Sequence, residues 1–315
     1  MNLSIITPHY NDLEGLKRVY ACLQAQTLAA WNWVIVDDTS GAETKQEMQE
    51  WFDNLADQKV QIQLNKEKTN ASVCRNIGAD LAKSETLVFL DSDDKITPDF
   101  VANRNVAFTD FAVFKNTAVL DKYRGEIPLF DAKDNYLNYF LSAKFIWPIT
   151  AILWHKDFFN AIGKFHPDLP RLQDVELAIR ALQLSTNYSI IDKPIDFYYR
   201  VNPIRERKNF VPPVCNAVYL FVSKLLQTES LNQHQLSLTS GYYFLCVRYL
   251  ERSGSRKHID LVQRNLGLFY KKRYIGFIKY VTGFIVLKLY GYKVLSGSLF
   301  LRINRRLFKP KHIEA

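Results

Sequence analysis

The sequence lacks the features that mark several special classes of protein. Its 4 cysteines in 315 residues form no close pair, which disfavours a disulfide framework and a cysteine-rich metal site. None of the 6 histidines has the H-E-x-x-H spacing of a zinc protease. Residues 1–30 contain no apolar block of the signal-peptide kind, so we expect a cytoplasmic protein.

Glycine-rich phosphate loops and membrane-spanning runs are also missing. Neither G-x-G-x-x-G nor G-x-x-x-x-G-K-[ST] follows the first predicted strand, which removes the main support for a dinucleotide-binding or P-loop protein. The longest uncharged stretches near the C-terminus, Tyr280–Leu287 and Val294–Leu301, have eight residues each. A transmembrane helix needs about 20 apolar residues, so none is expected.

Acidic residues are missing from one long segment. Residues 271–311 hold 11 of the 41 Lys and Arg residues and none of the 32 Asp and Glu residues. The rest of the chain is close to neutral. The positive net charge therefore belongs to this basic tail, and it does not indicate that the whole protein binds nucleic acid.

The N-terminal half alternates short apolar strands with amphipathic helices. We predict strands at Leu3–Thr7, Trp33–Val36, Val60–Leu64 and Thr86–Leu90, with helices after Asp12, at 43–56 and at 71–83. Strands that are apolar on both faces belong to a parallel sheet covered by helices on each side. The fold class is therefore α/β.

Polar residues follow three of these strands. They are Thr7–Tyr10, Asp37-Asp38 and Asp91–Asp94, and we expect them to share the carboxyl edge of the sheet, where ligands bind. In an extended segment Asp91 and Asp93 project together, and two close carboxylates favour a hard cation such as Mg²⁺ or Mn²⁺. The alternative is a solvated turn in which Asp94 or Thr97 caps the following helix.

Four motifs in order resemble glycosyltransferase family 2, whose members are inverting enzymes with the GT-A fold. The motifs are S-I-I-T-P-H-Y-N at 4–11, V-I-V-D-D at 34–38, N-A-S-V-C-R-N-I-G at 70–78 and F-L-D-S-D-D at 89–94. The third is similar to the family's A-R-N-x-G segment, with Cys74 in place of Ala. The resemblance covers about residues 1–205 and implies a Rossmann-like, mostly parallel sheet.

The resemblance also implies roles for individual residues. Thr7, Pro8 and Tyr10 would line the nucleotide base, Asp37 would accept a hydrogen bond from it, and Arg75 would approach the base or the diphosphate. Asp91 and Ser92 would lie beside the nucleotide-sugar, and Asp93 would bind the metal ion. Asp38 and Asp94 are possible accessory residues. Tyr10 and Arg75 could instead only pack or pair at the surface, and Asp38 could be a turn residue.

Inverting transfer needs a base that takes the proton of the acceptor hydroxyl. Residues 170–180, P-R-L-Q-D-V-E-L-A-I-R, resemble the family's late [E/Q]-D segment, which implies that Asp174 is this base. The alternative for Asp174 is a first-turn carboxylate favoured by the helix dipole. Glu176 is the reserve candidate, although its spacing from Arg180 predicts an ion pair on the helix surface. Arg200 and Arg205 resemble a late segment that closes over the donor diphosphate, or they belong to an exposed charged loop.

The chain is predicted to have two parts. Residues 1–210 form the catalytic domain, with a nucleotide-binding half at about 1–120 and an acceptor-side half at about 121–210. Residues 211–315 form a helical extension, with helices at 214–228, 234–252 and 256–270. From Phe269 a helical stripe of aromatic and apolar residues runs to Ile285 beside basic residues, which is typical of a helix lying in an anionic membrane surface. The stripe could instead dock on the catalytic domain.

The sequence therefore predicts a metal-dependent glycosyltransferase at the inner face of the cell membrane. Its partners would be a nucleotide-sugar, most simply a UDP-sugar, and a glycan or lipid-linked acceptor of surface polysaccharide. Nucleic acid is not expected as a partner. The alternatives are a nucleotidyltransferase acting on sugar phosphates, which would want a glycine-rich loop after the first strand, and a degenerate membrane-bound scaffold.

Overall fold

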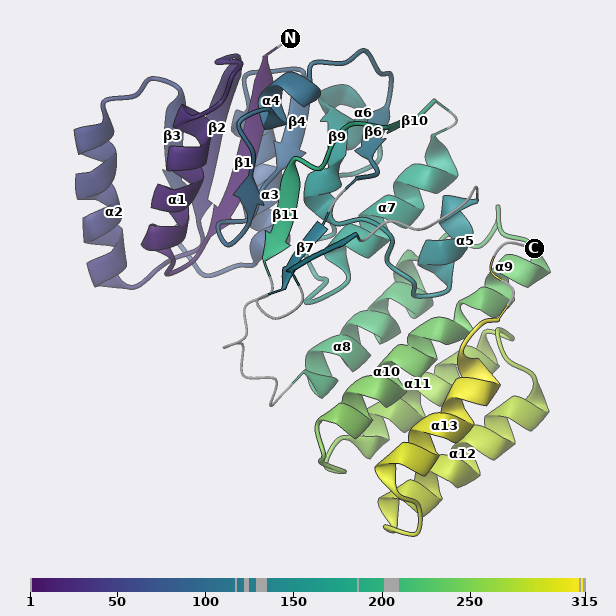
Figure 1. The fold of residues 1–315 in the computed structure, drawn as a ribbon. Coiled ribbons are helices and arrows are strands. Elements are labelled where there is room, and N and C mark those ends of the chain that lie inside the picture. The colour runs from purple at the N-terminus through teal and green to yellow at the C-terminus, as the bar shows by residue number, and fades with distance from the viewer. Residues whose placement is uncertain are drawn as a thin grey trace. The chain divides into compact units, whose positions relative to one another are not determined.

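The computed structural model describes residues 2–116, 118–121, 125–128, 135–185, 187–200, 210–311 and 313. The chain divides into two compact units. The N-terminal unit comprises residues 1–131, 147–167 and 184–203, and the C-terminal unit comprises residues 132–146, 168–183 and 204–315. Figure 1 shows both units and labels their elements.

The N-terminal unit is built on a seven-stranded sheet in the order β10-β6-β9-β4-β1-β2-β3. Its strands are β1 (Leu3–His9), β2 (Trp31–Asp37), β3 (Val60–Leu64), β4 (Thr86–Phe89), β6 (Phe111–Phe114), β9 (Ile152–His155) and β10 (Ser189–Ile191). All neighbouring pairs are parallel except those of β9, which runs antiparallel to β4 and β6. The predicted mostly parallel α/β sheet is confirmed, whereas the antiparallel direction of β9 was not predicted.

The helices of this unit follow the predicted alternation. They are α1 (Leu13–Gln24), α2 (Ala42–Leu55), α3 (Ala71–Leu81), α4 (Phe100–Asn103), α6 (Lys156–Ala161) and the short helix η1 (Ile149–Ala151). Asp12 caps α1 as predicted, because its Oδ1 accepts from Gly15 N over 3.0 Å. Asn70 caps α3 in the same way. These caps fix where each helix begins, directly after a loop at the carboxyl edge of the sheet.

Apolar side chains of the helices and of the strands form the core beside the sheet. Leu16 and Leu23 of α1 and Met48 of α2 pack with Ile5 and Trp33, and all five are almost fully buried. Helix α3 contacts β1 and β2. Strands buried on both faces explain why the sequence shows continuous apolar runs rather than alternation. A smaller sheet has the order β5-β11-β7-β8, with β5 (Lys95–Ile96), β11 (Phe197–Arg200), β7 (Ala118–Asp121) and β8 (Gly125–Pro128).

The C-terminal unit is helical over its described residues. Its elements are α5 (Tyr136–Leu141), α7 (Gln173–Leu184, whose last residue is assigned to the other unit), α8 (Val211–Leu220), η3 (Phe221–Leu225), α9 (Gln233–Leu238), α10 (Ser240–Arg252), α11 (Ile259–Lys271), α12 (Phe277–Gly291) and α13 (Gly297–Phe308). The helices α10, α11, α12 and α13 pack on one another. The predicted helices at 214–228 and 234–252 are each divided in two in the structure.

The basic tail contributes to the core of this unit. The predicted single stripe from Phe269 to Ile285 was wrong, because α11 ends at Lys271 and α12 begins only at Phe277. The Phe308 ring at the end of α13 lies 4.5 Å from the Tyr243 ring of α10, centroid to centroid. The tail therefore packs on the other helices of its own unit. Over the described residues, no helix has the length and apolar character needed to cross a membrane.

Candidate active site

Loops meet at the carboxyl ends of β1, β2 and β4. His9, the last residue of β1, places Nδ1 2.8 Å from Oδ1 of Asp37, the last residue of β2. Ser92, just after β4, donates its hydroxyl to Asp12 Oδ2 over 2.7 Å. Since β4, β1 and β2 are neighbours in the sheet, the three predicted polar segments are brought together at the edge where open α/β sheets bind ligands.

Asp37 is fully buried, and both of its carboxylate oxygens accept hydrogen bonds. Oδ1 accepts from Ser40 Oγ over 2.5 Å as well as facing His9, and Oδ2 accepts from Ser40 N over 3.0 Å. His9 Nε2 accepts from the backbone N–H of Asp12, so the ring proton lies on Nδ1 and points at Asp37. Burial opposes ionisation, but the hydrogen bonds from His9 and Ser40 outweigh it and lower the pKa of Asp37. Asp37 is therefore a fixed, ionised carboxylate.

Asp38 is held by residues that precede α3. Its Oδ1 accepts from Thr69 N at 2.7 Å and Thr69 Oγ1 at 2.6 Å, and its Oδ2 lies 2.7 Å from Lys68 Nζ. Burial raises the pKa of Asp38, yet the contacts with Lys68 and Thr69 lower it by more, so the net shift is downward. The same Lys68 ammonium stands 3.2 Å from the centre of the Tyr10 ring, which is half-exposed. A cation on that ring face fixes the aromatic side chain at the rim of the crevice.

Asp91, Asp93 and Asp94 form a compact group of carboxylates. One oxygen from each lies within 4.8 Å of the others. The backbone N–H of Asp94 donates to Asp91 O over 3.2 Å, so the segment is a turn. The expectation of an extended segment was therefore wrong, and the turn is what adds Asp94 to the predicted pair. Three hard oxygen ligands at this spacing fit a divalent cation such as Mg²⁺ or Mn²⁺.

Arg75 joins α3 to this group. Its Nη2 lies 2.5 Å from Asp91 Oδ1, and the guanidinium carbon is 5.4 Å from the centre of the Phe165 ring. The side chain is almost fully buried, whereas that of Asp91 is one-third exposed. Cys74, next to it, is also buried, and burial raises the pKa of its thiol to about 11. Cys74 thus serves as a small apolar residue where the family segment has Ala.

Thr7 and Pro8 lie within β1. The Thr7 hydroxyl accepts a hydrogen bond from Trp33 Nε1 over 2.8 Å and is fully buried, so the side chain belongs to the sheet interior. Pro8 is half-buried and pairs in register with Val36 of β2. Any contact of these two residues with a nucleotide therefore remains a prediction, and Tyr10 is the exposed residue of this segment.

Asp174 belongs to the C-terminal unit and lies in the first turn of α7, partly exposed. Glu176 is buried and forms a bidentate ion pair with Arg180, with Nε–Oε1 at 2.8 Å and Nη2–Oε2 at 2.7 Å. The predicted pairing of Glu176 with Arg180 is confirmed, although the pair is buried rather than on the helix surface. Arg205 lies outside the described residues, and Arg200 ends β11.

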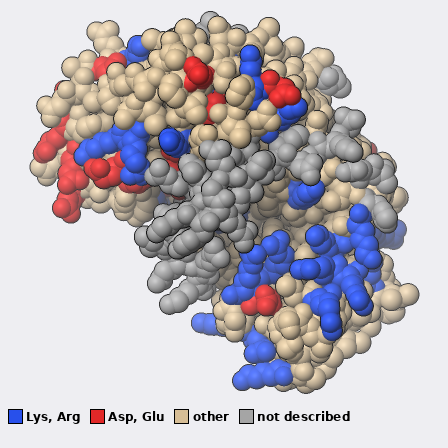
Figure 2. All heavy atoms as spheres, in the orientation of Figure 1, with Lys and Arg blue, Asp and Glu red and all other residues tan. Residues whose placement is uncertain are grey.

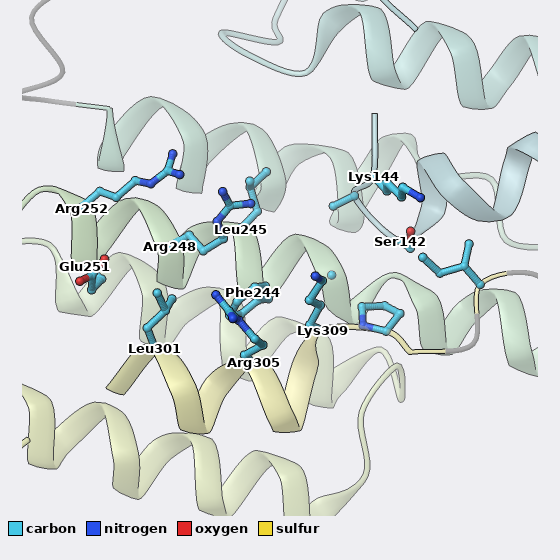
Figure 3. Close-up of a pocket in the computed structure, with 14 residues that line it drawn as sticks. Ser142, Lys144, Phe244, Leu245, Arg248, Glu251, Arg252, Leu301, Arg305 and Lys309 are labelled. Carbon is cyan, nitrogen blue, oxygen red and sulfur yellow. The ribbon is translucent and has the colours of Figure 1, made fainter. Parts of the chain in front are cut away.

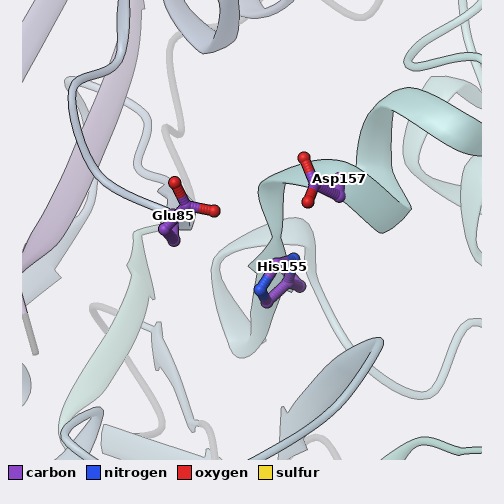
Figure 4. A group of neighbouring side chains, drawn as sticks. All are labelled: Glu85, His155 and Asp157. Atoms are coloured by element: carbon purple, nitrogen blue, oxygen red, sulfur yellow. The ribbon is translucent and has the colours of Figure 1, made fainter.

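A second group of metal-ligand types lies at the other end of β4. Glu85, His155 and Asp157 each place one ligand atom within 4.8 Å of the others (Figure 4). The two carboxylates are exposed, and Asp157 stands in the first turn of α6, where the helix dipole favours a negative charge. This favourable interaction with the helix dipole accounts for Asp157 without a metal ion.

Sequence patterns missed four of the residues that shape the crevice. Ser40 and His9 fix Asp37, and Lys68 and Thr69 fix Asp38. The pairs His9–Asp37 and Lys68–Asp38 join residues about 30 positions apart in the chain. No periodicity marks such partners; only the position of His9 between two predicted site residues was a signal.

Residues 4–104 match the family model of glycosyl transferase family 2. The amylovoran biosynthesis glycosyltransferase AmsB of Erwinia amylovora is 25% identical over 215 residues, covering 64% of this chain and 70% of AmsB. The N-terminal unit therefore contains a glycosyltransferase domain. Residues 4–104 are thus similar to glycosyl transferase family 2, and the rest of the chain lies outside that match.

Solved structures agree on the fold. Residues 1–349 of S. aureus TarS, in complex with UDP-GlcNAc, align with a TM-score of 0.59 at 16% identity, covering 98% of this chain and 88% of that one. The mannosyltransferase PcManGT from Pyrobaculum calidifontis, in complex with GDP-Man and Mn²⁺, aligns with a TM-score of 0.57 at 12% identity, covering 97% and 84%. The chain spans 53% of a longer TarS structure. The fold is GT-A.

Proposed function

We propose that this protein is a metal-dependent inverting glycosyltransferase that moves a sugar from a UDP-sugar to a glycan or lipid-linked acceptor of bacterial surface polysaccharide. The observation that carries the proposal is the group of Asp91, Asp93 and Asp94 at the end of β4, tied by Ser92 to Asp12 after β1. The relationship to AmsB supports polysaccharide synthesis, and the UDP-GlcNAc complex of TarS supports a UDP-sugar.

The nucleotide would occupy the crevice over β1 and β2. Tyr10 offers an exposed aromatic face for the base, and Thr7 and Pro8 supply backbone beneath it. Asp37 is ionised and fixed by His9 and Ser40, and the proposed hydrogen bond from the base would have to reach a carboxylate that is buried in this structure; Asp38 holds the adjoining loop. Arg75 keeps Asp91 in place beside the ribose and brings positive charge toward the diphosphate.

Asp93 is the proposed metal ligand, with Asp94 and Asp91 beside it. The three carboxylate oxygens fit Mn²⁺ or Mg²⁺, and Arg75 already balances one of the three charges. A bound divalent ion would stabilise the negative charge that develops on the departing diphosphate. The solved Mn²⁺ complex of PcManGT supports a metal in a protein of this fold.

Asp174 is the proposed base. Inversion is a single displacement at the anomeric carbon, so the acceptor hydroxyl must lose its proton as it attacks. Asp174 is partly exposed in the first turn of α7, whereas the neighbouring Glu176 is buried and bound to Arg180 on both oxygens. This difference favours Asp174 over Glu176. Arg200 and Arg205 remain proposed accessory residues for the donor.

The test is hydrolysis of UDP-sugars in the absence of acceptor, with Mn²⁺ and with EDTA. We expect UDP release that requires metal and is lost in Asp93→Asn. The matched control Asp53→Asn, an exposed carboxylate on α2, should hydrolyse donor normally. UDP affinity in Mn²⁺ that is unchanged in a folded Asp93→Asn protein would contradict the assignment. Release of diphosphate from a nucleoside triphosphate and a sugar phosphate would instead identify a nucleotidyltransferase.

We further propose that α12 lies on the anionic inner surface of the cell membrane. Phe277, Ile278 and Ile285 are exposed on α12, with Ile278 at 80%, and together they span about 100° of the helix circumference. The opposite side of the helix carries the buried Val286 and Leu287. On the face shown in Figure 2, the C-terminal helices also carry many Lys and Arg side chains and few acidic ones. An exposed apolar strip beside basic residues suits an anionic leaflet.

Point variants test this better than deletion of the tail, since α12 and α13 supply buried residues to their unit. We expect the full-length protein to sediment with phosphatidylglycerol-containing vesicles and to be released only partly by high salt. Ile278→Ser/Ile285→Ser should sediment less, whereas Leu64→Ser, an exposed apolar residue on β3, should not differ from the unmodified protein. Equal sedimentation of all three proteins would contradict membrane binding through α12.

A further inference from the structure

A basic cavity of about 410 Å³ lies within the C-terminal unit. Its lining residues come from α10, α13, the turn after α5 and the segment after α13. Five of them are cationic: Lys144, Arg248, Arg252, Arg305 and Lys309. Figure 3 shows Arg248 projecting from α10 and Arg305 and Lys309 reaching from α13 and its end toward the same space.

Over the described residues, cationic side chains in the lining of the basic cavity outnumber carboxylates by five to one. Glu251 is the single carboxylate in the lining, and it lies beside Gly297, where an added Cβ would stand 3.1 Å from its Oε1. Among the residues that the structure describes, none of the five cations forms an ion pair with a carboxylate. Burial, and then the neighbouring Arg252 and Arg305, lower the pKa of Arg248. Arg248 is therefore repelled by Arg252 and Arg305, and a bound anion would relieve this repulsion.

A second basic cavity of about 550 Å³ lies in the same unit. The two cavities share Lys309 and Pro310 in their linings. Lys279, Arg306 and Lys311 add positive charge in the second cavity. Positive groups thus extend through two adjoining hollows, which suits a ligand that carries more than one anionic group.

We propose that the basic cavity binds phosphate groups of the acceptor, and hence that the acceptor substrate is a phosphate-bearing glycan. Arginine is the side chain best suited to phosphate, because its planar guanidinium donates two parallel hydrogen bonds. Arg248, Arg252 and Arg305 supply three such groups, and Lys144 and Lys309 add point charges. This inference rests on the proposed function, and it places phosphate recognition in the same unit as Asp174. A phosphodiester polymer and an isoprenyl diphosphate both present this phosphate chemistry, and the experiment below distinguishes them.

The concave shape of the two cavities suits a phosphate-bearing acceptor molecule better than it suits a membrane surface. Both cavities are concave, whereas a bilayer contacts a convex or flat face. The exposed apolar residues of α12, Phe277, Ile278 and Ile285, line neither cavity. The two kinds of binding therefore use different residues and can be separated by mutation.

The experiment is calorimetric titration of the full-length protein with a synthetic glycerol phosphate oligomer and, separately, with geranyl diphosphate. EDTA is present so that metal-dependent binding near Asp93 does not contribute. We expect Arg248→Gln/Arg305→Gln to weaken binding of at least one probe by about tenfold or more, since hydrogen bonds to charged groups are strong. Arg302→Gln is the matched control, an exposed arginine on α13 outside both cavities, and should bind within about twofold of the unmodified protein.

The two probes identify the source of the phosphate, and the variants identify the site. Arg305→Gln/Lys309→Gln, both exposed residues, serves as a second cavity variant if the first does not fold. The proposal is overturned if neither probe binds, if Arg302→Gln weakens binding as much as the cavity variants, or if the cavity variants lose only vesicle binding. Donor hydrolysis of the same preparations is measured in parallel. Normal hydrolysis without phosphate binding would contradict this inference and leave the proposed function intact.

Discussion

The Arg75 guanidinium on α3 lies 2.5 Å from the Asp91 carboxylate that follows β4. This pair joins two sequence motifs and places a buried positive charge beside Asp93 and Asp94. Arg18 and Asp12 form a second pair of opposite charges in a different environment. Nη2 of Arg18 lies 3.8 Å from Oδ1 of Asp12, and the Arg18 side chain is about half exposed. The first pair therefore holds the carboxylate group together, and the second contributes little.

Arg75→Met should lower the free energy of unfolding by about 1–3 kcal/mol, because it removes the buried guanidinium that pairs with Asp91. Added Mn²⁺ should restore more stability to this variant than to the unmodified protein, since the ion takes over part of the guanidinium's role. Urea titrations with and without Mn²⁺ measure both effects. Arg18→Met should stay within about 0.5 kcal/mol of the unmodified protein. A loss in Arg18→Met as large as that in Arg75→Met would show that burial is not the cause.

Gly15→Ala should destabilise the protein by about 1–3 kcal/mol. A Cβ at position 15 would stand 2.1 Å from Asp12 Oδ2 and 2.8 Å from Ser92 O, so Asp12 must give up its cap or its bond to Ser92. Gly267→Ala on α11 is the matched control, since a Cβ there meets nothing within 4 Å. It should stabilise by about 0.5–1 kcal/mol through helix propensity. Denaturation midpoints that move the same way for both variants would refute the steric argument.

Asp174→Asn and Glu176→Gln should have opposite signatures. Asp174→Asn should reduce transfer by about 10²–10⁴-fold while donor binding and stability persist, as expected for a base. Glu176→Gln should retain transfer per folded molecule but lose about 3 kcal/mol of stability, because it leaves the Arg180 charge buried without its full partner. Transfer rates and thermal melts of both variants check this. If Glu176→Gln lost transfer while Asp174→Asn stayed active, Glu176 would be the base and Asp174 would not.

Protonation of Asp37 should contribute to acid unfolding. Its pKa is lower in the folded protein than the usual 3.8, so its stabilising contribution is complete above about pH 4 and is lost as the pH falls through the folded value. The pKa of Asp38 is also lowered in the folded protein, so its protonation should likewise reduce stability at low pH. Asp37→Asn should be less stable at pH 7 and show a shallower fall of unfolding free energy between about pH 5 and 2. Asp53→Asn, at an exposed position, should show the same dependence of unfolding free energy on pH as the unmodified protein. An identical dependence in Asp37→Asn, Asp53→Asn and the unmodified protein would show that Asp37 does not contribute to acid unfolding.

Local patterns were sufficient for the nucleotide-binding half. Apolar runs of four or five residues located β1, β2 and β4, and the prediction for the alternating segment Val60–Leu64 coincides with β3. The acidic residues after β2 and β4 could be assigned to one edge because parallel strands end on the same side. These conclusions need only the identity and order of neighbouring residues, which the sequence contains.

Tertiary contacts decided the partners of the charged groups and the place of the tail. The sequence showed Asp91–Asp94 as acidic, but only the turn through Asp94 N–H and Asp91 O groups three of the carboxylates. The sequence also did not predict that Phe308 of the tail packs on Tyr243 of its own unit, while membrane binding of the tail stays a prediction. Such contacts join residues distant in the chain, and their energy depends on burial and geometry that periodicity does not encode. The sequence by itself thus determined the strands, the acidic edge and the family resemblance, and the tertiary structure alone determined which charges are paired, which are buried and which surround the basic cavity.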